Sequence, residues 1–261
     1  MNNSKHFPRK RFGQHFLHEQ HVVDRIIRSL HPRPGEHIVE IGPGLGALTG
    51  DLLAVTDTLQ AIELDRDLVV QLKERFDEPE RLIIHQADAL KFDFCSLSPS
   101  PQKVRLIGNL PYNISTPLIF HVLEQSHCIQ DMYFMLQKEV VDRMAAPPGG
   151  KDYGRLSVMV QWRCEVEKLF EVGPGAFTPP PKVQSAVVRL APYAISPLDV
   201  NDPKIFSRLV QQAFSQRRKS LRNTLKGMLS AQDLEAVGID PRARAETLSV
   251  EEFARLSNMV K

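Results

Sequence analysis

The spacing of apolar and polar residues divides most of the chain into alternating helices and strands. Between residues 19 and 30, apolar side chains recur at helical spacing, which predicts an amphipathic helix. A short apolar run at 37–41 then predicts a buried strand that ends in glycines. Strands separated by helices imply parallel crossover connections, so we expect an open, doubly wound α/β sheet. Further helices are predicted over 45–55, 66–76 and 116–126, and further strands over 58–63, 81–87, 104–107, 132–136 and 186–190.

The pattern changes near the C-terminus. Residues 192–203 are rich in turn-forming residues and predict a linker. Beyond the linker only helical spacing recurs, so we expect a small all-α domain there. The predicted division is an α/β domain over 1–195 and a helical domain over 204–261. Within the helical domain, helices are expected over 204–214, 217–229, 231–237 and 250–258.

Composition and charge narrow the class of protein. The chain is 42% hydrophobic and 25% charged, as in ordinary folded proteins. No apolar stretch approaches the roughly 18 residues of a membrane span, and no export signal is recognised, so we expect a cytoplasmic protein without a membrane partner. The net charge of +2 conceals four cations in 1–11 and a balance of +5 in 204–261. Basic segments at both ends of a chain whose middle is net acidic indicate contact with a polyanion. The alternative is that the basic residues only form a solvated helix face.

The cysteines and histidines suggest neither a disulfide framework nor a metal site. Cys95, Cys128 and Cys164 are odd in number and lie 33 and 36 residues apart, which matches no CxxC zinc site. We therefore expect reduced cysteines that behave as small buried hydrophobes. The histidines form no HxxxH or HxH pair, so no metal is expected.

The first chemical signal is a glycine-rich turn that follows the strand at 37–41. Gly42, Gly44 and Gly46 stand between strand and helix, where a backbone without side chains lets a ligand approach the N–H groups. In a GxGxxG dinucleotide fingerprint the third glycine would fall on Ala47, which that fingerprint tolerates. From this turn alone, NAD(P) and S-adenosylmethionine are both open as the cofactor.

Acidic residues follow the next two predicted strands. Glu63 ends one strand, at a place where an acid accepts hydrogen bonds from ribose hydroxyls in either cofactor. Asp88 ends the following strand, where a carboxylate suits the amino group of an adenine. A helix cap or turn would explain either acid as well. Together, acids at two successive strand ends predict a crevice that holds one adenosine.

The segment from Asn109 to Tyr112 decides between the reaction classes. The Asn109 amide oxygen and the Leu110 carbonyl can accept both N–H groups of an adenine N6 amine. Pro111 fixes the turn, and the Tyr112 ring offers a flat face for an extruded base. A nicotinamide oxidoreductase leaves this segment without a role. The pattern therefore favours an adenine N6-methyltransferase. A DNA adenine methyltransferase could use the same segment, so the segment alone leaves open whether the substrate is RNA or DNA.

At this point the chain closely resembles the KsgA-type ribosomal RNA adenine N6-dimethyltransferases, relatives of the Erm resistance methyltransferases. The resemblance implies a class I S-adenosylmethionine-dependent methyltransferase, with a Rossmann-like doubly wound sheet and an all-α C-terminal domain. It also implies a substrate: two adjacent adenosines near the 3′ end of 16S rRNA, in a small ribosomal subunit or its precursor, each receiving two methyl groups. Seven segments carry the resemblance in the family's order: 10–17, 39–46, 62–67, 108–117, 134–140, 153–157 and 176–183.

The resemblance also assigns roles to single residues. Phe177 matches an aromatic that encloses the target base opposite Tyr112. His15 stands where the family usually has Asn, and we expect it to keep a backbone contact while its side chain bonds differently. A role mainly in ribosome assembly remains open, and we expect a monomer. The residues expected to contact the cofactor are His15, Leu17, Gly42, Gly44, Glu63, Asp88 and Asn109, those expected to act on the base are Asn109, Leu110, Pro111, Tyr112 and Phe177, and those expected to contact RNA are Arg217, Arg218, Lys219 and Arg222.

Overall fold

The computed structural model describes residues 14–99 and 101–260, so the basic segment 1–11 and the beginning of the 10–17 motif lie outside the described residues. The chain forms two compact units. The first comprises Met1–Val141 and Glu167–Pro192, and the second comprises Asp142–Val166 and Tyr193–Lys261. This division differs from the predicted domains, because residues 142–166 belong to the same unit as the C-terminal helices rather than to the α/β unit.

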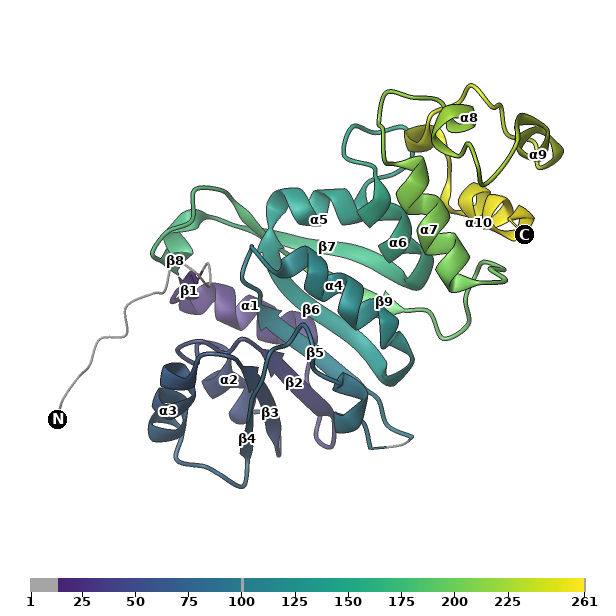
Figure 1. Ribbon diagram of the computed structural model, residues 1–261. Coiled ribbons are helices and arrows are strands. Elements are labelled where there is room, and N and C mark those ends of the chain that lie inside the picture. The colour runs from purple at the N-terminus through teal and green to yellow at the C-terminus, as the bar shows by residue number, and fades with distance from the viewer. Residues whose placement is uncertain (1–13, 100, 261) are drawn as a thin grey trace. The chain divides into compact units, whose positions relative to one another are not determined.

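A seven-stranded sheet is the scaffold of the first unit, with strand order β4-β3-β2-β5-β6-β9-β7 (Figure 1). The strands from β4 to β6 are parallel, and β9 runs antiparallel to β6. The chain moves outward from β2 to β4 and then returns to β5, so the doubly wound prediction is confirmed. The strands are β2 His37–Ile41, β3 Leu59–Glu63, β4 Leu82–Gln86, β5 Val104–Asn109, β6 Ile129–Gln137, β7 Cys164–Val172 and β9 Ser185–Pro192, and a separate antiparallel pair joins β1 Phe16–Leu17 to β8 Phe177–Thr178.

Helices of the first unit bury apolar side chains against this sheet. The stripe predicted for 19–30 is present, with Val23, Ile26 and Leu30 at most 2% exposed. The predicted helix at 45–55 is shorter, because the glycine turn continues to Leu48. Gly44 and Gly46 have φ of 60° and 81°, values that favour glycine and exclude a regular helix. The α-helices are α1 Gln20–Leu30, α2 Thr49–Leu53, α3 Arg66–Arg75 and α4 Ser115–Glu124, and the 3₁₀ turns are η2 Phe94–Leu97, η3 Ser126–Cys128 and η4 Pro174–Ala176.

The second unit is mainly helical. Trp162 packs on Phe206 with ring centroids 4.4 Å apart. This contact joins the helix over 155–163 to the helix over 203–213. The helix predicted over 217–229 is reduced to four residues, Leu221–Thr224, and the cations at 217–219 precede it in a turn. No helix in the described part of the chain is long and apolar enough to cross a membrane. The α-helices are α6 Arg155–Arg163, α7 Pro203–Ala213, α8 Leu221–Thr224, α9 Ala231–Ala236 and α10 Val250–Met259, with η5 Ala245–Thr247, and α5 Lys138–Ala145 runs from the first unit into the second.

Candidate active site

A cavity of about 330 Å³ lies at the carboxyl ends of the parallel strands in the first unit. Its size falls within the range of small-molecule sites, and ligands of open α/β sheets bind at this edge. The lining comes from the turns after β2, β3 and β4, from the end of β5 and from the segment before α1. Ten predicted residues line it: His15, Leu17, Gly42, Gly44, Glu63, Asp88, Asn109, Leu110, Pro111 and Tyr112.

Glu63 is buried at the end of β3 and organises the glycine turn. Its Oε2 accepts the Gly44 N–H at 3.3 Å, and its Oε1 accepts the Asp65 N–H at 2.8 Å. Burial raises the pKa of the Glu63 carboxyl, and hydrogen bonds from the backbone N–H groups of Asp65, Gly44 and Leu64 oppose that shift. Each carboxylate oxygen can accept a further hydrogen bond, so Glu63, which lines the cavity, can also accept hydroxyl donors from a ligand.

Asp88 lies in the turn after β4 and also lines the cavity. Its Oδ1 accepts the Leu90 N–H at 3.0 Å, so part of this carboxylate stabilises the local turn. Asp88 therefore stabilises its turn and also lines the cavity in which a ligand would bind.

Asn109 is held in one orientation by the segment that precedes α1. Its Nδ2 donates a hydrogen bond of 2.9 Å to the backbone carbonyl of His15. Because the amide nitrogen is used in this way, the amide oxygen Oδ1 is the acceptor offered to a ligand amine. The His15 side chain bonds elsewhere, with Nδ1 2.7 Å from the Pro179 carbonyl and its ring 5.3 Å from the Tyr112 ring.

The Tyr112 hydroxyl has a buried partner that sequence analysis did not find. It lies 2.6 Å from Oγ of Ser185, at the beginning of β9, and Ser185 is fully buried. Burial raises the pKa of Tyr112, so the phenol stays protonated. The hydroxyl therefore anchors the ring, although the prediction gave a role only to the flat face. No signal in the sequence relates two residues 73 positions apart.

Glu40 also lines the cavity, but sequence analysis gave this acid no role in binding or catalysis. It is 1% exposed on the central strand β2, and Thr49 Oγ1 donates to its Oε2 at 2.6 Å. Burial raises the pKa of Glu40 to about 7. The signal available in the sequence was a lone acid within an otherwise apolar buried strand.

Phe177 does not line the cavity. It is 2% exposed and belongs to the apolar core that also contains Leu17, its partner in the β1–β8 pair, and Tyr133. In this position Phe177 pairs with Leu17 of the segment before α1. The placement does not support the expectation that its ring encloses a base opposite Tyr112.

The four predicted RNA contacts are exposed in the second unit. Arg217 is partly engaged, because it forms an ion pair of 3.0 Å with Glu246 and donates to the Lys151 carbonyl. The segment after it pairs with residues 241–244 through backbone hydrogen bonds, including a bridge between Ser220 and Arg244. This pairing adds the exposed cations Arg242 and Arg244 to the group. Sequence analysis missed these two because acidic residues separate them from the first four along the chain.

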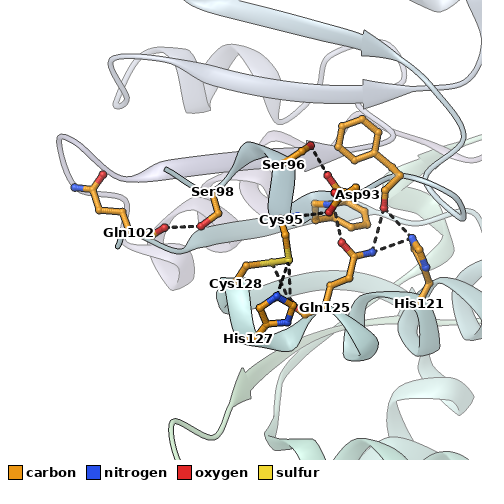
Figure 2. Close-up of a disulfide and its surroundings, with 11 residues drawn as sticks. Asp93, Cys95, Ser96, Ser98, Gln102, His121, Gln125, His127 and Cys128 are labelled. Carbon is orange, nitrogen blue, oxygen red and sulfur yellow. Dashed lines mark hydrogen bonds between the residues drawn. A yellow bond between two sulfur atoms is a disulfide. The ribbon is translucent and has the colours of Figure 1, made fainter. Parts of the chain in front are cut away.

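The cysteine prediction is wrong for two of the three residues. Cys95 in η2 and Cys128 in η3 form a disulfide (Figure 2), whereas Cys164 is free and buried. Their separation of 33 residues gives no spacing signal. The parallel pairing of β5 with β6 explains the contact, because η2 precedes β5, η3 precedes β6, and the starts of parallel neighbours lie at one edge.

A doubly wound sheet with a cavity of about 330 Å³ at its switch point, lined by Asn109 to Tyr112, defines a class I methyltransferase with a helical C-terminal part. Comparison with known proteins agrees. The family model described as ribosomal RNA adenine dimethylase matches residues 5–261. This chain belongs to that family.

Individual relatives span nearly the whole chain. Ribosomal RNA small subunit methyltransferase A of Pseudomonas aeruginosa is 58% identical over 256 residues, which cover 98% of this chain and 96% of that protein. A dimethyladenosine transferase from Plasmodium falciparum has a similar structure, with a TM-score of 0.79, 26% identity, and coverage of 93% of this chain and 96% of the other. The 23S rRNA methyltransferase ErmE follows with a TM-score of 0.71, 25% identity, and coverage of 94% and 99%. The predicted relationship to the Erm enzymes is thereby confirmed.

Proposed function

We propose that the protein transfers methyl groups from S-adenosylmethionine to the N6 amines of two adjacent adenosines near the 3′ end of 16S rRNA. The expected product is dimethyladenosine at both positions, and the reaction belongs to the biogenesis of the small ribosomal subunit. We place the protein in the cytoplasm and expect it to act as a monomer on the small subunit or its precursor. The orientation of Asn109 by the His15 carbonyl, beside Tyr112, is the observation that carries this proposal.

The residues around the cavity suit S-adenosylmethionine. Glu63 is a buried carboxylate that can accept the two ribose hydroxyls, and Asp88 can accept the adenine amino group. The Gly44 turn leaves room for the ligand beside the backbone. When bound, this cofactor supplies an electrophilic methyl group on a sulfonium, which is already a good leaving group.

The chain contributes positioning and hydrogen bonding to the target amine. The lone pair of adenine N6 is delocalised into the ring, so the free amine is a weak nucleophile. Acceptors at Asn109 Oδ1 and at the Leu110 carbonyl can hold both N–H groups and favour a more tetrahedral nitrogen. The Tyr112 ring can hold the extruded base by stacking. The amine loses its proton to solvent after methylation, and catalysis comes chiefly from alignment.

The direct test uses ribosomal RNA from cells that lack this protein. Small subunits from those cells should accept methyl groups from the purified protein, and nuclease digestion should release dimethyladenosine. Duplex DNA with adenines should accept none, which separates the DNA methyltransferase alternative. Binding of the subunits without methyl transfer would instead leave the assembly-factor alternative and contradict the proposed activity.

Replacing Glu63 with alanine should weaken S-adenosylmethionine binding. A charge-assisted hydrogen bond contributes roughly 1.5–3 kcal/mol, so the dissociation constant should rise by about 10- to 150-fold. Titration calorimetry measures this change. Glu74→Ala, which removes an exposed acid from the following helix α3, is the matched control and should bind normally. Equal affinity in the two variants would leave Glu63 as part of the turn alone.

Replacing Tyr112 should separate the ring from its hydroxyl. Tyr112→Ala removes both and should abolish most turnover. Tyr112→Phe keeps the flat face but loses the bond to Ser185, so we expect a reduction of about fivefold to tenfold, near 1–1.4 kcal/mol. Ser185→Ala removes the same bond and should have a similar effect. If the hydroxyl acts only through Ser185, the Tyr112→Phe, Ser185→Ala double variant should be no slower than either single one.

Neutralising the exposed cations of the second unit should weaken RNA binding and its dependence on salt. For each cation–phosphate interaction that is removed, the slope of log K against log salt should flatten by roughly 0.7–0.9. Arg217 should contribute least, because Glu246 already neutralises part of its charge. The measurement is a salt titration of rRNA affinity for the variant with glutamine at Arg217, Arg218, Lys219 and Arg222.

The matched control for this variant removes four exposed cations from the first unit. It should keep its slope, and both variants should bind S-adenosylmethionine normally. An unchanged slope in the first variant would mean that its cations form a solvated face. The control carries glutamine at Arg28, Lys73, Lys91 and Lys103, all of which are exposed.

A further inference from the structure

A second group of reactive side chains lies at the start of the parallel strands. Cys95, His127 and Cys128 offer two sulfurs and one ring nitrogen, all within 4.8 Å of one another. Nε2 of His127 is 3.3 Å from the Cys95 sulfur. Figure 2 shows the imidazole beside the two sulfurs. The methyltransferase chemistry uses none of these residues, because its cavity is lined from the opposite ends of the strands.

We propose that the reduced form of this group is a binding site for a thiophilic divalent cation, Zn²⁺, with Cys95, Cys128 and His127 as ligands. Two thiolates and one imidazole are a donor set typical of zinc. The two thiolate charges balance the charge of the cation. This departs from the expectation that the chain binds no metal.

The distances fit tetrahedral coordination after one local change. With Zn–S near 2.3 Å and Zn–N near 2.0–2.1 Å, neighbouring ligands of a tetrahedron lie about 3.6 Å (N to S) and about 3.8 Å (S to S) apart. The His127 nitrogen is already close to the first separation. The sulfurs, which are bonded to each other in the disulfide, separate by rotation of their side chains once that bond is broken. His127 is exposed and Cys95 is half-buried, so water has access to the fourth position.

The frame around the ligands does not depend on the disulfide. Gln125, at the end of α4, accepts the Phe94 N–H at 2.7 Å and donates to the Phe92 carbonyl at 3.1 Å. Asp93 accepts the Cys95 N–H at 3.0 Å. The two Gln125 bonds tie η2 to the segment that leads into His127 and Cys128, so the three ligands stay close when the sulfur–sulfur bond is broken. The backbone carbonyl oxygen of Gln125 lies 3.8 Å from the Cys95 sulfur and 3.1 Å from the Cys128 sulfur.

The disulfide form becomes the metal-binding form by reduction followed by binding of the cation. A dithiol reductant supplies two electrons and two protons, which break the Cys95–Cys128 bond and give two thiols, while the reductant becomes a cyclic disulfide. Zn²⁺ then replaces the two thiol protons, which pass to the buffer. Disulfide and metal are thus alternative links between the same two loops.

The test uses the full chain and Co²⁺ as a spectroscopic probe for the zinc site. Protein reduced with a dithiol and freed of the reductant should bind one Co²⁺ with a thiolate-to-cobalt charge-transfer band, and Zn²⁺ should abolish that band by displacement. The oxidised chain should give no such band. Ligation by other histidines does not produce the signal, because the band requires a sulfur ligand.

Variants assign the ligands. Cys95→Ser and Cys128→Ser should each remove most of the band. Loss of a residue that only hydrogen-bonds to a metal ligand costs roughly 10- to 100-fold in metal affinity, so His127→Gln, which removes a ligand itself, should weaken Co²⁺ binding by at least that factor. Cys164→Ala is the matched control, because burial raises the pKa of that thiol to about 12 and makes it a poor ligand. S-adenosylmethionine binding checks that each variant is folded. The proposal is overturned if the reduced parent shows no charge-transfer band, or if the band survives in the Cys95→Ser, Cys128→Ser double variant.

Discussion

Replacing Asn109 with alanine is expected to reduce methyl transfer by roughly 10²- to 10³-fold, the usual cost of removing one aligning polar group from a reaction centre. The structure supplies a physical reason for this expectation. The amide nitrogen is held by the His15 carbonyl at 2.9 Å, which leaves the oxygen for the target amine. Single-turnover assays on undermethylated small subunits measure the change.

The control is cofactor affinity, which should fall much less than turnover. Asn109→Asp provides a second comparison, because aspartate keeps an acceptor of the same size but cannot donate to the His15 carbonyl. Two acceptors would then face each other, so Asn109→Asp should also be slow. Near-normal methylation by the alanine variant would remove Asn109 from the proposed chemistry.

Replacing Glu40 with glutamine is expected to change how the stability of the protein depends on pH. Burial raises the pKa of Glu40 from 4.5 to about 7, so between these values the folded state binds more protons than the unfolded state. The free energy of unfolding must therefore fall as pH rises through this window, by up to about 3 kcal/mol from this group. Glutamine stays neutral and can still accept from Thr49, so this contribution should disappear.

Urea unfolding of parent and variant between pH 4.5 and 7.5 measures the difference. The variant should become progressively more stable relative to the parent as pH rises. Thr49 donates to Glu40 and lowers its pKa. Thr49→Val removes this hydrogen bond and should raise the pKa of Glu40 further, so the free energy of unfolding should depend on pH more strongly than in the parent. A difference between parent and Glu40→Gln that stays constant over this range would contradict the raised pKa.

The main residues of the candidate site were predictable because each follows a strand at a chemically informative place. Glu63 and Asn109 end strands directly, and the turn containing Gly44 follows another. Parallel strands bring their carboxyl ends to one edge, so position along the chain was enough to predict proximity. Ser185 was not predictable in this way. It begins a strand that runs antiparallel to β6, and nothing local indicates that its hydroxyl reaches Tyr112.

The same contrast separates the elements of the fold. Helices and strands with clear apolar spacing were predicted, and the doubly wound order follows from their alternation. β7 and α6 were not predicted. The segment 142–166 shows no boundary signal, yet it joins the C-terminal helices through contacts such as Trp162 on Phe206. Membership of a compact unit depends on which apolar surfaces meet, and local spacing does not specify the partner.

The class of protein could be predicted without coordinates, because the glycine turn, the strand-end acids and the Asn-Leu-Pro-Tyr segment are local patterns whose chemistry can be interpreted directly. The partners of these residues depend on long-range packing. Arg105, for example, is buried in β5 and pairs with Asp131 at 2.8 Å and with Glu36 at 2.7 Å, although these acids lie 26 and 69 residues away. The disulfide between Cys95 and Cys128 and the burial of Phe177 have the same origin. Local spacing specifies which face of an element is apolar, whereas long-range packing selects which side chains meet across it.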